Sequence, residues 1–185
     1  MPRAGLSTAA VVEAALAVVD EQGVGGLTLA AVAQRTGVAT PSLYKHVAGL
    51  GELRTLLGAR VIEDMAETFT RAVVGRSGDD AIMALLHAYR GYVQAHPDRY
   101  AAAPLDPLHD PAQAVAGEKL LEVVFGALRA YDLERSEAIH VTRCLRAVAH
   151  GFASLEAGGG FGLPESLDQT YDQLIGVVLG VLPRS

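Results

Sequence analysis

The sequence predicts an all-α protein, and three observations support that prediction. Apolar residues recur at spacings of three and four in most segments, which is the period of an amphipathic helix. Alanine and leucine are abundant, whereas the alternating β-branched residues of strands are missing. Half of the 185 residues are hydrophobic and a fifth are charged, so the composition is that of a globular protein of one or two domains.

A first helix is expected over residues 7–22. Ser7 or Thr8 can cap its N-terminus, because a hydroxyl accepts a hydrogen bond from a first-turn amide. Its inner face is marked by three apolar residues at helical spacing, Val12, Leu16 and Val19. Residues 23–26, three of them glycine, end this helix and form a loop.

Two short helices joined by a tight turn follow in residues 27–53, which read LTLAAVAQRTGVATPSLYKHVAGLGEL. Thr28 is placed to cap the first of them, and Gly37 to end it in a left-handed conformation. Thr40 is the expected N-cap of the second. Pro41 then occupies the first helical position, where its missing N–H is not needed.

The two faces of this segment differ in their chemistry. Five apolar residues share an inward face: Val32, Ala33, Val38, Leu43 and Val47. The second helix, expected to carry residues 42–47, turns four polar residues outward: Ser42, Tyr44, Lys45 and His46. Hydroxyl, phenol, ammonium and imidazole groups on a rigid apolar base suit a DNA groove, where they meet phosphates and base edges. We therefore interpret the segment as a helix-turn-helix whose second helix reads DNA.

The same segment resembles the N-terminal DNA-binding domain of the TetR family of bacterial transcription regulators. The matching positions are Leu27, Thr28, Ala33, Gly37, Val38, Leu43, Tyr44, His46, Val47 and Leu53. The resemblance implies a sequence-specific transcriptional regulator, a repressor rather than an enzyme. Members of the family often have a phosphate-contacting lysine where this chain has Leu50, so Arg54 or Lys45 is expected to make that contact. The predicted DNA-binding residues are Thr28, Thr40, Pro41, Ser42, Tyr44, Lys45, His46 and Arg54, with Arg60 as a further candidate.

The charge balance does not by itself point to DNA. The net charge is −6, and residues 1–55 contain four basic and four acidic residues: Arg3, Arg35, Lys45, Arg54, Glu13, Asp20, Glu21 and Glu52. Binding is therefore expected to rest on a few placed contacts and to depend only modestly on salt. Without the helix-turn-helix, this balance would argue against nucleic acid. A helical adaptor for protein or small molecules is the alternative, which the outward polar residues disfavour.

The predicted domains are a helix-turn-helix domain over residues 1–48 and a larger helical domain over residues 49–185. Helices of the second domain are expected over residues 49–74, 113–131 and 134–157. Another is expected to start at Asp79 or Asp80 and to stop at His96-Pro97, where a short helix opens, and the last is expected to start at Pro164. Three prolines mark a loop at residues 104–111. Residues 141–155 carry apolar positions at alternating steps of four and three, which is a packing seam.

The C-terminal half resembles the WHG-type ligand-binding domain that accompanies some TetR-like N-termini. His150-Gly151-Phe152 and Ser154-Leu155-Glu156 carry the likeness, although Ala149 replaces the tryptophan of that motif. The resemblance implies a homodimer on a palindromic operator, with the last two helices pairing across a two-fold axis. The expected interface residues are Val141, Leu145, Val148, Phe152, Tyr171, Leu174 and Val178. The alternative is that these apolar stripes face the core of their own chain.

A small-molecule effector is also implied by the resemblance. The candidate pocket residues are Met65, Phe69, Tyr89, Tyr92, Tyr100, Phe125, Cys144 and His150. Such a pocket, apolar with a few hydroxyls and one imidazole, suits a flat or apolar molecule. For each residue alone, an ordinary place in the core or on the surface remains the alternative.

Catalytic and metal-binding motifs are missing from the sequence, and no cofactor is expected. The six histidines form no metal-ligand set of the H-E-x-x-H kind. Asp106, His109 and Asp110 could hold a metal, but in a proline-rich loop a polar turn is the favoured interpretation. Cys144 lies on the seam and is expected to be a buried small residue.

Several features predict a cytoplasmic protein. A single cysteine cannot form an intrachain disulfide, which favours a reducing compartment. Met1-Pro2-Arg3 is not followed by the continuous apolar run of a signal peptide. No apolar stretch approaches the length of a membrane span, so no membrane partner is expected.

Overall fold

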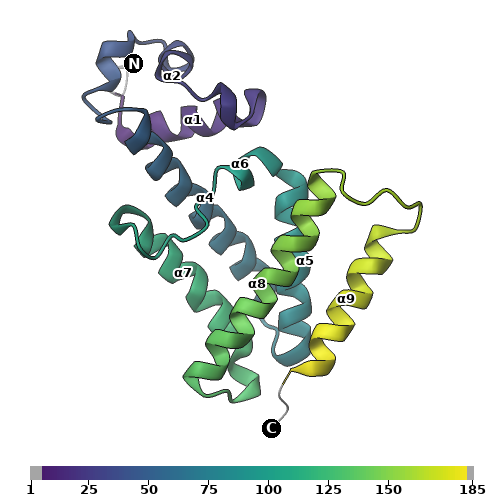
Figure 1. The fold of residues 1–185 in the computed structure, drawn as a ribbon. Coiled ribbons are helices and arrows are strands. Elements are labelled where there is room, and N and C mark those ends of the chain that lie inside the picture. The colour runs from purple at the N-terminus through teal and green to yellow at the C-terminus, as the bar shows by residue number, and fades with distance from the viewer. Residues whose placement is uncertain (1–5, 183–185) are drawn as a thin grey trace. The chain divides into compact units, whose positions relative to one another are not determined.

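The computed structural model describes residues 6–182, and all regular structure in that range is helical, which confirms the predicted fold class (Figure 1). The elements are α1 (Thr8–Gln22), η1 (Val24–Gly26), α2 (Leu29–Thr36), α3 (Thr40–Leu43), α4 (Leu50–Val73), α5 (Gly78–Ala95), α6 (Pro97–Ala101), α7 (Pro111–Leu128), η2 (Arg129–Tyr131), α8 (Arg135–Ala157) and α9 (Leu167–Val181). Met1-Pro2-Arg3, on which the expectation about a signal peptide rests, lie outside the described residues.

The described chain divides into two compact units. The first unit comprises residues 6–64 and 96–118, and the second unit comprises residues 65–95 and 119–182. Helices α4 and α7 therefore contribute residues to both units. The predicted domain boundary after residue 48 lies inside the first unit.

Helix α1 contributes more buried apolar residues to the first unit than any other helix. Of the two N-cap candidates, Ser7 caps α1: its hydroxyl accepts a hydrogen bond from the Ala10 amide at 3.2 Å. Six residues of α1 are buried: Val11, Val12, Ala15, Leu16, Val18 and Val19. Helices α2 and α6 pack against α1. Val38 was predicted to point inward but is only half-buried, because it lies in the turn after α2 and not on a helix face.

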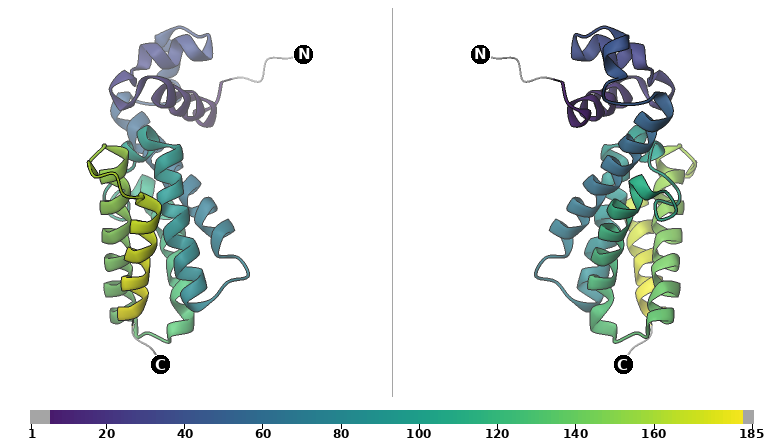
Figure 2. Two further views of the ribbon diagram at one scale, coloured as in Figure 1. Left: turned by 90° about the vertical axis from the view of Figure 1, so that its right-hand side faces the viewer. Right: turned by 90° about the vertical axis from the view of Figure 1, so that its left-hand side faces the viewer.

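In the second unit, α5 packs against α8 and α9, which Figure 2 shows in teal, green and yellow. Tyr171 of α9 is fully buried, and its hydroxyl donates a hydrogen bond to the Leu86 carbonyl of α5 at 2.8 Å. The Phe152 ring of α8 lies 4.7 Å from the Tyr171 ring, measured between centroids. The seam of α8 and the stripe of α9 thus meet inside this unit.

This packing corrects the prediction for the dimer interface. Leu145, Phe152, Tyr171 and Val178 are buried within their own chain, because α5 covers the face on which they lie. Val141, Val148 and Leu174 are half-buried. The large apolar residues that stay exposed on α8 and α9 are Leu155, Val177 and Val181.

Two further predictions are wrong in detail. Helix α9 begins at Leu167 and not at Pro164, because the Ser166 hydroxyl accepts a hydrogen bond from the Gln169 amide at 3.4 Å and so caps the helix there. Cys144 is exposed and not buried. It follows Arg143 on the solvent side of α8, whereas Leu145 takes the inward position.

Candidate DNA-binding surface

Helix α2 begins and ends as its sequence predicts. The Thr28 hydroxyl accepts a hydrogen bond from the Ala31 amide at 3.1 Å and caps the helix. Gly37 has a φ of 69°, a left-handed conformation that glycine adopts without strain. The amide of Val38 then donates to the Ala33 carbonyl at 3.1 Å, which closes the turn. The chain is thereby redirected into α3 with little freedom.

The second helix of the motif is shorter than predicted. It covers Thr40–Leu43 only, and Ala39 rather than Thr40 is its N-cap, with no capping side chain. Thr40 is thus already helical, because the Ser42 amide bonds to the Ala39 carbonyl at 2.8 Å and starts the helix one residue earlier. The following residues, up to His46, form a turn. We call residues 40–47 the reading segment.

Two buried residues and three hydrogen bonds hold the reading segment in place. Leu43 and Val47 are almost completely buried. The Leu43 carbonyl accepts from the amides of His46 at 2.8 Å and Val47 at 3.0 Å. From α1, the Thr8 hydroxyl donates to the His46 carbonyl at 3.2 Å. The polar side chains on the opposite face are therefore fixed relative to α1.

The exposed face of the reading segment carries the predicted polar groups. Tyr44 is 57% exposed, and Lys45 and Pro41 are also exposed. Ser42, His46 and Thr40 are half-buried, so only their outer atoms can meet a ligand. This surface offers one ammonium, one phenol and several weaker donors, which fits contacts with phosphates and base edges.

The start of α4 also borders this region of the chain. The Glu52 carboxylate accepts a hydrogen bond from the Ala48 amide, so this acidic side chain caps α4. Arg54, one turn into α4, is exposed. Arg60, the further DNA-binding candidate, is not available to a phosphate, because its guanidinium pairs with Glu13 at 2.9 Å and with Asp64.

The acidic and basic side chains of the N-terminal region differ in whether they have a partner. Each acidic side chain among residues 6–55 has a partner: Glu13 pairs with Arg60, Asp20 with Arg99, Glu21 with Arg35, and Glu52 with the Ala48 amide. Within the described residues, Lys45 and Arg54 have no ion pair or hydrogen bond through their side chains. Among residues 6–55 the acidic side chains are thus all engaged, whereas two cations remain available to phosphates, which weakens the charge argument against DNA.

Comparisons with known proteins decide the family. Residues 11–46 match the family model described as bacterial regulatory proteins, tetR family, and residues 82–178 match the tetracyclin repressor-like C-terminal domain. The chain belongs to the TetR family of transcriptional regulators. As the resemblance implied, this TetR-family chain is a helix-turn-helix DNA-binding regulator and not an enzyme.

One relative and two solved structures show which proteins this TetR-family chain resembles. The relative is YobS of Bacillus subtilis strain 168, an uncharacterized HTH-type transcriptional regulator, which is 35% identical over 90% of this chain and 87% of its own length. A TetR variant from Acinetobacter baumannii AYE, solved in complex with minocycline, has a TM-score of 0.72 at 18% identity, covering 95% of both chains. BioQ, solved with its double-stranded DNA operator, has a TM-score of 0.70 at 20% identity, covering 96% of this chain and 98% of its own. At these identities the two structures show the fold alone.

The predicted effector-binding residues of this TetR-family chain are divided between the two units. Met65, Phe69 and Tyr92 are buried in the second unit, where the Phe69 and Tyr89 rings stack with centroids 5.5 Å apart. Phe125 and His150 of the same unit are half-buried. Cys144 lies on the exposed side of α8, so it is removed from the candidates. Tyr100 belongs to the first unit.

The loop before α7 is explained by local hydrogen bonds. The His109 Nδ1 atom lies 2.6 Å from an Asp106 carboxylate oxygen, and Asp110 accepts from the Ala112 amide at the start of α7. In the described part of the chain, no three histidine, cysteine or acidic side chains are grouped as metal ligands. None of the helices between residues 6 and 182 is long and apolar enough to cross a membrane.

Sequence reasoning missed two contacts that fix the reading surface of this TetR-family chain. The acidic Glu52 three residues after Gly49 is a recognisable helix-start signal, so its capping role could have been predicted. The bond from Thr8 to the His46 carbonyl joins residues 38 apart in sequence and has no local signal.

Proposed function

We propose that this regulator is a repressor that binds a palindromic operator as a homodimer and is released by a small-molecule effector. The observation that carries the proposal is the reading segment: its apolar side is buried, its backbone is bonded to α1, and Tyr44 and Lys45 project from it. Two copies related by a two-fold axis present two such segments to half-sites about 34–36 Å apart. A DNA-bound regulator of this kind acts in the cytoplasm.

The reading segment supplies both positioning and specificity in this proposal. Lys45 and His46 contact phosphate or purine edges, and Ser42 and Tyr44 contact the backbone or thymine methyl groups. Thr28 at the start of α2, and Thr40 and Pro41 at the start of the reading segment, contact phosphates near helix N-termini. Arg54 takes the phosphate contact for which family members often use a lysine at the position of Leu50.

The test is operator selection followed by affinity measurement. A random DNA pool is enriched on the wild-type protein, and the binding of the consensus is measured by fluorescence anisotropy. The Tyr44→Ala/Lys45→Ala variant is expected to bind at least about tenfold more weakly, or about 1.4 kcal/mol. Lys119→Ala, which removes an exposed lysine of α7, is the matched control and keeps wild-type affinity. No enriched sequence at low salt, or equal binding by all three proteins, contradicts the proposal.

The exposed faces of α8 and α9 are the proposed dimer interface, in place of the buried seam. Leu155, Val177 and Val181 are exposed by 52%, 64% and 76%, so α8 and α9 both leave large apolar side chains uncovered in the single chain. Val177→Asp is expected to shift the molar mass in light scattering from dimer to monomer. Val74→Asp alters an equally exposed valine, at 71%, and should leave the mass unchanged. A monomeric wild type would refute the dimer.

Effector binding is proposed for the second unit, near the stacked rings of Phe69 and Tyr89. A ligand weakens DNA binding only if it favours one of two states, since equal affinity for both shifts nothing. Planar apolar compounds are first screened by thermal shift, and those that raise the melting temperature are added to the operator assay. A tight ligand that leaves operator affinity unchanged would contradict release. Tyr89→Ala should abolish the thermal shift and keep operator binding.

A further inference from the structure

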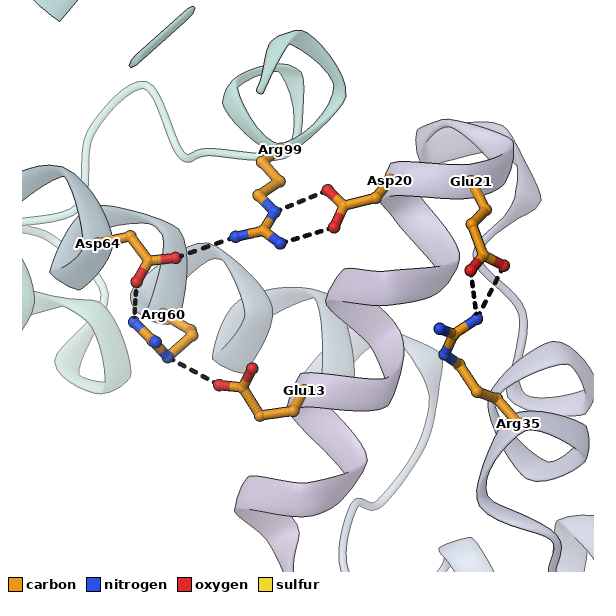
Figure 3. A network of polar contacts seen from close by, with 7 residues as sticks. All are labelled: Glu13, Asp20, Glu21, Arg35, Arg60, Asp64 and Arg99. Atoms are coloured by element: carbon orange, nitrogen blue, oxygen red, sulfur yellow. Dashed lines mark hydrogen bonds and ion pairs between the residues drawn. The ribbon is translucent and has the colours of Figure 1, made fainter. Parts of the chain in front are cut away.

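Five charged residues of the first unit form one continuous chain of ion pairs, drawn in Figure 3. It starts at Glu13 of α1, passes through Arg60 and Asp64 of α4 to Arg99 of α6, and returns to Asp20 of α1. The Arg99 guanidinium donates to both Asp20 carboxylate oxygens, at 2.7 and 2.6 Å, and lies 3.4 Å from Asp64. Three helices are thus joined by one network.

The position of Asp20 explains why this network matters for α1. Asp20 and Glu21 lie in the last turn of α1, which contains no basic residue. Negative charge is unfavourable at a helix C-terminus, because the backbone dipole is negative there. Arg99 supplies the missing positive charge, and its hydrogen bonds hold the pKa of the Asp20 carboxyl below its ordinary value. Glu21 is compensated separately by Arg35 of α2 at 2.7 Å.

A second side chain of α6 also lies close to the C-terminal end of α1. Gly23, the C-cap of α1, has a φ of 71°. A Cβ atom at this position would lie 3.3 Å from an Asp98 carboxylate oxygen of α6. The residue next to Asp98 is Arg99, so the ion pair and the close approach hold the same two segments together.

The opposite end of α1 holds the reading segment. There the Thr8 hydroxyl donates to the His46 carbonyl, twelve residues away from Asp20 along α1. The six buried residues of α1 make it a rigid part of the first unit between these two ends. Helix α1 therefore connects the Arg99–Asp20 ion pair to the reading segment.

We propose that Arg99 is a positioning residue for operator binding: through Asp20 and α1 it fixes the reading segment, without touching DNA itself. The proposal rests on the operator binding proposed above and assigns it a determinant outside the helix-turn-helix. Arg99 is sequence-distant from that motif and lies just after the His96-Pro97 step that opens α6.

Operator affinity distinguishes positioning from a simple charge effect. Arg99→Ala is expected to weaken binding of the selected operator by at least about fivefold, at a temperature where the variant is folded. Asp20→Ala is expected to weaken operator binding as well. The double variant Asp20→Ala/Arg99→Ala should bind no more weakly than the single variant with the lower affinity. A long-range charge effect predicts the opposite sign for Asp20→Ala, since removing an acid strengthens DNA binding.

The salt dependence provides a second distinction. Removing a phosphate contact lowers the slope of log affinity against log salt by about one per contact. Arg99→Ala should therefore keep the wild-type slope, whereas Lys45→Ala should reduce it. Arg71→Ala, which removes an exposed arginine paired with Glu67 at 3.8 Å, is the matched control and should change neither affinity nor slope. A reduced slope for Arg99→Ala would show a direct phosphate contact and overturn the proposal.

A measurement without DNA keeps the proposal testable if no operator is found. The amides of His46 and Val47 are bonded to the Leu43 carbonyl, so their hydrogen exchange reports the order of the reading segment. Exchange of both amides should be faster in Arg99→Ala than in wild type and unchanged in Arg71→Ala. Unchanged exchange in Arg99→Ala overturns the positioning role, whereas a failed operator selection with faster exchange refutes only the proposed function.

Discussion

One arginine joins three helices in each compact unit, and the surroundings of the two differ. Arg99 joins α6 to α1 and α4 with 23% of its side chain exposed, whereas Arg90 joins α5 to α8 and α9 with only 8% exposed. Partly exposed ion pairs contribute little to stability but constrain geometry. A buried charge, by contrast, strongly destabilises the fold once its partner is removed. The same residue type therefore orients helices in the first unit and maintains cohesion in the second.

The surroundings of Arg90 show how completely its charge is compensated. Its guanidinium donates to both Glu156 oxygens at 2.6 Å and pairs with Asp168 at 2.8 Å. Its central carbon lies 5.4 Å from the Phe152 ring centroid and 5.1 Å from that of Tyr171, a distance typical of cation–π contacts. The hydrogen bonds with Glu156 raise the pKa of Arg90 above its ordinary value, which stabilises its charged form.

The largest effect is expected when this buried charge is removed. Arg90→Met leaves Glu156, with 13% of its side chain exposed, without its cation, and should lower the free energy of unfolding by about 3 kcal/mol. Arg76→Met breaks an exposed pair with Asp80 and should change it by less than about 0.5 kcal/mol. Urea unfolding of both variants measures the difference. Equal losses would remove the distinction between buried and exposed arginines.

A smaller effect is expected from the hydroxyl beside Arg90. Tyr171→Phe keeps the ring against Phe152 and removes only the hydrogen bond to the Leu86 carbonyl, so the free energy of unfolding should fall by about 1–2 kcal/mol. Burial raises the pKa of the Tyr171 hydroxyl, which therefore remains a donor. Tyr44→Phe makes the same change at an exposed site and should be neutral. A neutral Tyr171→Phe would mean that ring packing alone holds α9.

Stability of the first unit should depend more on local caps. Thr28→Ala removes the acceptor of the Ala31 amide and should lower the free energy of unfolding by about 1 kcal/mol. Thr170→Ala also removes a hydroxyl near a helix start, but that hydroxyl donates to the Ser166 carbonyl and caps no amide. Thermal unfolding should show a shift for Thr28→Ala only. If the two variants shift alike, capping is not the cause.

The features predicted correctly from sequence are those whose causes are local. The caps at Ser7 and Thr28, the left-handed Gly37 and the break at His96-Pro97 each depend on residues within a few positions. Because these interactions join residues close together in the chain, they can be predicted from the sequence. The predicted start of α3 was wrong by one residue, because a backbone hydrogen bond to the Ala39 carbonyl begins the helix at Thr40. The predicted start of α9 was wrong by three residues, because the Ser166 hydroxyl caps the helix before Leu167.

Features that depend on packing partners distant in sequence could not be predicted. Periodicity gave α8 one apolar stripe, but whether α5 or a second subunit covers it depends on the fold, so Leu145 and Phe152 were assigned to the dimer interface. Cys144 was placed inside for the same reason. In the candidate site, exposure of Tyr44 and Lys45 followed from the local pattern, whereas the pairing of Arg99 with a residue 79 positions away did not.

The smallest expected effect compares the carboxyl partners of the two arginines. Hydrogen bonds from Arg99 and Arg90 lower the pKa values of Asp20 and Glu156 below their ordinary ranges. A carboxyl with a lowered folded-state pKa contributes stability above its unfolded pKa, and this contribution is lost as the pH falls through the folded pKa. Both pairs should therefore be lost only in acid, below about pH 4.

Replacing each carboxyl by its amide measures the two contributions. The melting temperature is followed from about pH 6 to about pH 3 for wild type, Glu156→Gln and Asp20→Asn. Glu156→Gln should flatten the acid-induced decrease more than Asp20→Asn, because 13% of the Glu156 side chain is exposed against 34% for Asp20. Solvent screens the more exposed pair and reduces its share. If both variants reduce the acid-induced decrease in melting temperature equally, the two ion pairs contribute equally to stability. The difference between Arg99, which orients helices, and Arg90, which holds helices together, would then have to come from the packing around them.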